Sequence, residues 1–173
     1  ELYNPTDQPV ELAGWRLIKK TALGSEYILV DDFAEQKISS HAFLLVAHPA
    51  GYLGTTQPDL YFTTTNSIAD NNTIVLLNDL GEEVDKVGFG TVSDYEGAAA
   101  ANPAGGKSLE RKARVDSSAE TMAEGGSHYF LGNGEDTDSN LNDFIIREAP
   151  EPQNYFSELE FRGVLDPDIP ARQ

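Results

Sequence analysis

The sequence contains no cysteine, and its positive charges are few. The absence of cysteine excludes a disulfide framework, a thiolate-bound zinc or iron–sulfur site and a cysteine nucleophile. Only 12 lysine and arginine residues face 29 aspartate and glutamate residues in the 173-residue chain, so the formal net charge is −17. Nucleic acids and anionic membranes both attract lysine and arginine. We therefore expect neither of them as a partner.

Long hydrophobic runs are missing as well. No stretch approaches the ~20 apolar residues that a membrane-spanning helix needs, so we expect no membrane insertion. The apolar residues instead form short runs bounded by turn residues, which is the pattern of β-strands. We predict strands over residues 11–19, 26–30, 41–48, 73–77, 83–89, 107–113 and 144–147. Helical patterns are nearly absent, apart from residues 117–124, which begin with serines that can cap a helix.

Seven short strands and almost no helix predict an all-β fold, namely a β-sandwich with long loop insertions. Trp15 and Leu17 point the same way on the first long strand, so we expect Trp15 to anchor the core. Loops of this length tend to be functional or mobile. The expected insertions are residues 49–67, 91–106 and 115–127. Residues 163–173 contain two prolines and are expected to form a linker at the C-terminus.

Several motifs occur in an order typical of one family. The first is ELYNPTDQPVELAGWRL at the start of the chain, and DKVGFG, SLERK, GNGEDTDSNLNDF and APEPQN follow it. This order resembles the lamin tail domain, in the form found in large bacterial proteins, over residues 1–155. The resemblance implies an immunoglobulin-like sandwich whose first strand is truncated. Residues 156–173 are then a C-terminal extension.

The expected function follows from this resemblance and from the absence of a catalytic constellation. The chain has no HExxH motif, nucleophile elbow, P-loop or dinucleotide fingerprint. We expect a non-catalytic module of a larger bacterial protein, extracellular or at the cell surface, next to other domains of the same chain. It acts as a spacer or binds a protein or a glycan. The alternatives are a targeting domain attached to a nuclease-like or phosphoesterase-like hydrolase, and a filament-associated tail.

One acidic stretch is a candidate metal site. Asp136, Asp138 and Asn140 alternate as the first three ligands of an EF-hand or dockerin calcium loop do. The glycine and the glutamate that such a loop needs further on are missing, so a looser site would use Asp143. Calcium is accordingly the one cofactor that the sequence suggests. In the alternative interpretation these side chains accept hydrogen bonds from backbone N–H groups and hold the loop.

Aromatic and basic residues give two further candidates. Tyr52, Tyr61 and Phe62 lie in the first insertion and would form an exposed platform for a sugar or a peptide, or else fold the loop onto the sandwich. The basic residues near position 110 form either an anion patch or a strand face paired with acidic neighbours; they are Lys107, Arg111, Lys112 and Arg114.

Overall fold

Strands far outnumber helices in the computed structural model, which describes residues 1–161. The strands are β1 (Leu2–Tyr3), β2 (Val10–Glu11), β3 (Arg16–Lys20), β4 (Glu26–Val30), β5 (Lys37–Ile38), β6 (Phe43–Leu44), β7 (Val46–Ala47), β8 (Leu60–Tyr61), β9 (Thr73–Leu77), β10 (Glu83–Gly88), β11 (Ser108–Arg111) and β12 (Phe144–Arg147). The helices are α1 (Ala119–Met122) and α2 (Asn140–Asp143). The prediction of a β-rich fold is confirmed. Within the described residues no helix is long and apolar enough to cross a membrane. The predicted linker, residues 163–173, lies outside the described part.

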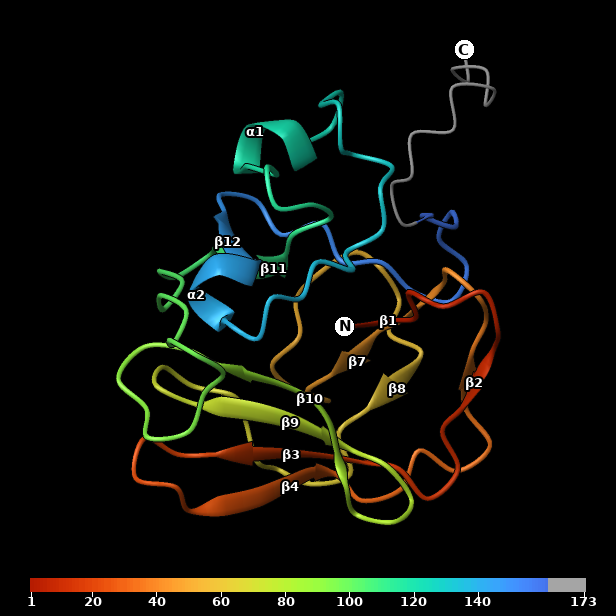
Figure 1. The fold of residues 1–173 in the computed structure, drawn as a ribbon. Coiled ribbons are helices and arrows are strands. Elements are labelled where there is room, and N and C mark those ends of the chain that lie inside the picture. The colour runs from red at the N-terminus through yellow and green to blue at the C-terminus, as the bar shows by residue number, and fades with distance from the viewer. Residues whose placement is uncertain (162–173) are drawn as a thin grey trace.

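The main sheet is antiparallel, with the strand order β10-β9-β3-β4 (Figure 1). Leu17 on β3 lies opposite Leu76 on β9, so both point to the same face of the sheet. Ile74 lies two residues before Leu76 and shares that face, whereas Val75 points to the other. This alternation gives the sheet one face for the core and one for the loops that cover it.

The first predicted strand is interrupted. Residues 11–19 divide into the end of β2 and most of β3, with a turn in which the Trp15 N–H donates to the Leu12 carbonyl. Gly14 has a φ of +78° in this turn, a conformation that glycine adopts without strain. The Gly14 N–H also donates to Asp32. The sequence pattern predicted one continuous strand here because a pattern of apolar residues does not show that Gly14 adopts a turn conformation.

The first predicted insertion contributes to the fold. The predicted strand 41–48 divides into β6 and β7, and β8, from residues 49–67, pairs with β7 in parallel. The Asp59 carboxylate accepts from the Leu45 N–H between β6 and β7 at 2.8 Å. The smaller pairs β1–β6, β2–β5 and β11–β12 are antiparallel. These long-range pairings have no local sequence signal.

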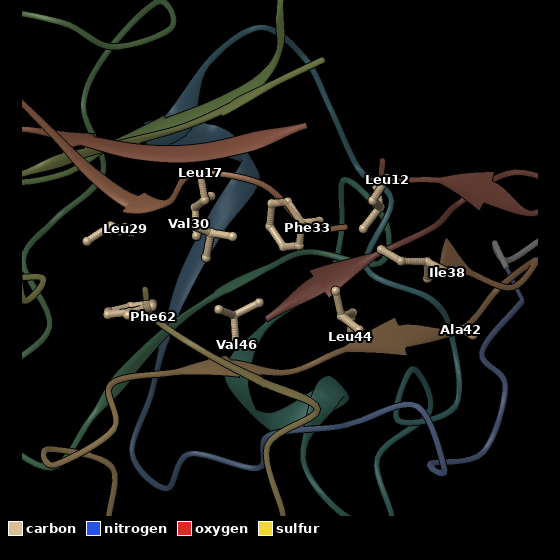
Figure 2. Close-up of a cluster of buried hydrophobic side chains, with 10 residues drawn as sticks. All are labelled: Leu12, Leu17, Leu29, Val30, Phe33, Ile38, Ala42, Leu44, Val46 and Phe62. Atoms are coloured by element: carbon tan, nitrogen blue, oxygen red, sulfur yellow. The ribbon is translucent and has the colours of Figure 1, made fainter. Parts of the chain in front are cut away.

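The hydrophobic core lies between the main sheet and the segment that runs from β5 to β7 (Figure 2). Its buried members are Leu12, Leu17, Leu29, Val30, Phe33, Ile38, Ala42, Leu44, Val46 and Phe62. Trp15 is only partly buried and packs against the outside of this cluster. The prediction that Trp15 anchors the core is therefore wrong, and Phe33, which is fully buried, takes the central place.

Other segments cover the outer face and one edge of the main sheet. Asp94, in the predicted insertion 91–106, makes ion pairs with Lys20 at 2.6 Å and with Lys86 at 3.0 Å on the outer face. At the free edge of β4, the Thr63 N–H donates to the Leu29 carbonyl at 2.9 Å. Covering an edge in this way removes a template for unwanted strand pairing.

Candidate ligand-binding cleft

A cleft of about 520 Å³ opens between the main sheet and the β11–β12 pair. Figure 1 shows β1 and the β11–β12 pair on the same side of the main sheet. The walls are largely apolar, with Ile74 and Leu76 from β9, Val87 from β10, Leu109 from β11 and Phe144 from β12. An apolar hollow with a few polar groups is the usual form of a ligand site.

Arg111 is the central polar group of the cleft. Its guanidinium donates to Asp85 at 2.6 Å and to the Glu135 carbonyl at 3.1 Å. It also lies 4.6 Å from the centre of the Phe144 ring, its cross-strand neighbour. Burial raises the pKa of Asp85, and the positive charge of Arg111 opposes that rise. The Arg111 side chain of β11 thus contacts both the neighbouring strand β12 and the edge strand β10.

A second ion pair lies beside this one. Glu110 accepts from the buried Arg147 at 2.5 Å and from the Asn133 amide at 3.1 Å. Burial raises the pKa of Glu110 even though the Arg147 charge lowers it. Lys107 pairs with Glu148 at 2.6 Å, each one residue beyond the end of the same strand pair. Lys107 and Arg111 thus have acidic partners, as the second interpretation of the basic strand expects.

The acidic stretch beside the cleft is held together by hydrogen bonds. The buried Asp143 carboxylate accepts from the backbone N–H groups of Thr137 at 3.0 Å and Ser139 at 3.1 Å, and from the Thr137 hydroxyl at 2.6 Å. Such bonds to a side chain hold a loop in one conformation. This network corresponds to the alternative interpretation of the stretch.

Asn140 connects the same stretch to the free edge of β10. Its side-chain oxygen accepts from the N–H groups of Gly88 at 2.8 Å and Glu96 at 3.1 Å. Its side-chain nitrogen donates to the Lys86 carbonyl at 2.9 Å and to the Glu96 carboxylate at 2.7 Å. The amide group thus makes four hydrogen bonds and is fully buried. The Asn140 side chain thus bonds to backbone groups at the edge of β10 that a further strand would otherwise pair with.

The predicted calcium ligands therefore have different environments. Asn140 and Asp143 are buried and hydrogen-bonded, whereas Asp136 and Asp138 are exposed. Among residues 1–161 no group of three or more histidine, aspartate or glutamate side chains is arranged to hold a metal ion. Asp136 lies 3.8 Å from Arg111 at the cleft. Calcium binding by this stretch stays a prediction.

The structure separates the residues of the predicted aromatic platform. Phe62 is 9% exposed and belongs to the core, so it is not available as a ligand surface. Tyr52 is half-buried and donates to the Thr56 carbonyl at 2.9 Å within its own loop. Tyr61 remains exposed and accepts from the Gln57 side chain at 3.3 Å. Adjacent strand residues point to opposite faces, which is why Tyr61 and Phe62 differ.

Glu160 is a buried acid whose backbone carbonyl accepts a hydrogen bond from Tyr3, a residue that lines the cleft. The Gln153 side chain donates to its carboxylate at 2.6 Å, and its own N–H donates to the His41 carbonyl. Burial raises the pKa of Glu160 to about 8, and the charges of Glu1 and Glu110 add to the rise. The segment that carries Glu160 thus packs on the domain, although residues 156–161 belong to the predicted extension.

Sequence reasoning singled out Arg111 but missed its partner Asp85 and the pair Glu110–Arg147. The alternating pattern of β10 and β11 predicts that Asp85 and Arg111 lie on strands. Their contact cannot be predicted from it, because they are 26 residues apart in the sequence. In the comparisons with known proteins, no family model matches the chain and no curated protein matches it. The resemblance to the lamin tail domain stays a prediction.

Proposed function

We propose that this chain is a non-catalytic binding module that holds a segment of another protein in the cleft. It is an immunoglobulin-like sandwich of the lamin tail type, part of a larger secreted or surface-exposed bacterial protein. The observation that carries this proposal is the cleft itself, an apolar hollow of about 520 Å³ on the core side of the sheet. The core between the main sheet and β5–β7 supports the sandwich architecture.

The chemistry of the cleft favours an apolar side chain next to a basic one. Leu76, Leu109 and Phe144 offer an apolar wall. The half-exposed carboxylates of Asp85 and Asp136 also line the cleft, and one cation, Arg111, is shared between them. The chain as a whole also carries a net charge of −17, which attracts cations. A segment with leucine or phenylalanine beside lysine or arginine fits both features.

The cation on β10 does not change this electrostatic balance. Lys86 also borders the cleft, but its ammonium group is 2.9 Å from Glu83 and 3.0 Å from Asp94. Asp94 in turn pairs with Lys20 on the outer face of the sheet. The charge of Lys86 is therefore neutralised before a ligand arrives.

The proposal is tested with short synthetic peptides and backbone amide NMR. One series joins leucine or phenylalanine to lysine, and a matched series replaces lysine by glutamate. We expect the basic series to shift the resonances of β10, β11 and β12, and the acidic series to shift them much less.

Two variants locate the site. Val84→Arg places a cation at a cleft residue that is 47% exposed, and Val115→Arg places the same charge at an unrelated residue that is 73% exposed. We expect Val84→Arg to weaken binding of the basic series about tenfold and Val115→Arg to leave it unchanged. Equal binding of both peptide series, equal effects of both variants, or hydrolytic turnover by the isolated chain would contradict the proposal.

A further inference from the structure

A second hollow lies away from the cleft, between three segments of the chain. It has a volume of about 430 Å³ and is lined by residues 35–37, 57–59 and 154–156. None of these residues lines the cleft, so this site is independent of the proposed function. We name it the aromatic groove because Tyr155 and Phe156 form one side of it.

The rings of the aromatic groove are exposed on a fixed backbone. Phe156 is 86% exposed, and its ring makes an edge-on contact with Tyr155 at 5.4 Å between ring centres. The Asn154 side chain accepts from the Phe156 N–H at 3.0 Å and donates to the Gln57 carbonyl at 2.9 Å. The Tyr155 N–H donates to the Asp59 carboxylate at 3.0 Å. Phe156 itself gains little from packing, while the turn that displays it is held in place.

The polar groups of the aromatic groove indicate a neutral ligand. Lys37 supplies one positive charge, and Glu35 and Asp59 supply two negative ones, of which the Asp59 carboxylate is already bonded to two backbone N–H groups. Gln36 and Gln57 supply amides that both donate and accept hydrogen bonds. An anionic ligand would meet the repulsion of a chain with net charge −17. The groove itself offers no excess of positive charge to overcome this repulsion.

The backbone of the groove offers few partners to an extended peptide. The Gln57 carbonyl already accepts from Asn154, the Asp59 N–H donates to the Leu45 carbonyl, and the Tyr155 N–H is bonded to Asp59. Strand addition needs such groups to be free. A sugar needs none of them, because its C–H faces stack on aromatic rings and its hydroxyl groups bond to side chains.

We propose that the aromatic groove binds a neutral oligosaccharide, with Tyr155 and Phe156 stacking on sugar rings and with Gln36 and Gln57 bonding to hydroxyl groups. The exposed Tyr61 extends this surface, since its hydroxyl group is bonded to Gln57. The site thus keeps one residue of the predicted platform and gains two that the sequence analysis did not name.

The test is isothermal titration calorimetry of the whole chain with cellohexaose, chitohexaose, xylohexaose and mannohexaose. We expect at least one of these neutral sugars to bind saturably at millimolar concentration or below. Phe156→Ala should weaken this binding about tenfold, and Phe156→Tyr should restore most of it. Phe130→Ala is the matched control, because Phe130 is 64% exposed and makes an edge-on contact with the tyrosine before it.

Three results would overturn the proposal: no saturable heat with any of the four sugars, an equal loss in Phe156→Ala and Phe130→Ala, or tighter binding of an acidic hexagalacturonate. The two sites are also separable. Val84→Arg, which tests the cleft, should leave sugar binding unchanged, and Phe156→Ala should leave binding of the basic peptides unchanged.

Discussion

The two halves of the sheet's inner face are filled in different ways. Beneath β3 and β4, side chains such as Phe33 and Leu44 are fully buried in the core. Beneath β9 and β10, Leu76 and Val87 face a cleft of about 520 Å³ that also contains Arg111. The same alternating pattern therefore builds a packed half and an open half. Which half becomes a site depends on what the rest of the chain places opposite the sheet.

The largest expected effect tests the packed half. Phe33→Ala removes a fully buried ring and should lower the free energy of unfolding by about 3–5 kcal/mol. Leu109→Ala, in the wall of the cleft, should cost about 1 kcal/mol because Leu109 is only partly buried. Urea denaturation measures both values. Equal costs would show that the two halves are packed alike.

The next effect concerns the edge strand of the open half. Asn140→Ala leaves the N–H groups of Gly88 and Glu96 and the Lys86 carbonyl without their partner, and should cost about 2–4 kcal/mol. Asn142→Ala, on the same helix but exposed, should change stability by less than about 0.5 kcal/mol. Thermal and urea unfolding of both variants decide this. If Asn140→Ala lowered the free energy of unfolding as little as Asn142→Ala, the conclusion that Asn140 closes the edge of β10 would be wrong.

A third effect is a pH dependence at Glu160, which is bonded to Tyr3 at the border of the open half. The pKa of Glu160 is about 8 in the folded chain, against an ordinary value of 4.5. Between these two pH values the folded chain keeps a proton that the unfolded chain has released, so stability falls as pH rises from 4.5 through 8. Glu160 should account for about 2–4 kcal/mol of this fall.

Glu160→Gln removes this titration and isolates the contribution of Glu160. Denaturant unfolding of both chains between pH 4.5 and pH 9 should show a shallower decline for the variant. The Asp85 carboxyl group, whose pKa is also raised, does not interact with Glu160, so it titrates alike in both chains and cancels in the comparison. Identical slopes would show that Glu160 is ionised in the folded chain.

The smallest expected effect is that of calcium on the acidic stretch next to the open half. Because Asn140 and Asp143 already bond to protein groups, we expect the Tm to be the same in millimolar calcium and in excess chelator. A ligand that binds only the folded chain raises the Tm as its concentration rises. A rise in Tm that Asp136→Asn abolishes would favour the calcium loop instead.

Strand formation was predictable because it depends on local pattern. The ranges 26–30, 73–77 and 144–147 coincide with β4, β9 and β12. The helix expected over residues 117–124 is observed as α1, and Ser118 caps it by accepting from the Thr121 N–H. Each of these elements is specified by its own residues.

Residues distant in the sequence determined the rest. Tyr61 and Phe62 look alike in the sequence, yet one is exposed and the other is in the core, because β8 pairs with β7 in one register. Trp15 is the largest side chain near β3, but the turn before it places it at the border of the core. Neither result follows from the residue type.

The acidity of the chain, its lack of cysteine and its short strands can all be read from the sequence, since composition and alternation act over a few residues. The contact of Asp85 with Arg111, the closure of β10 by Asn140 and the open half of the inner face arise only in the folded chain. These features depend on contacts across tens of residues. Such contacts are chosen by the packing of the whole chain and not by the preferences of any one segment.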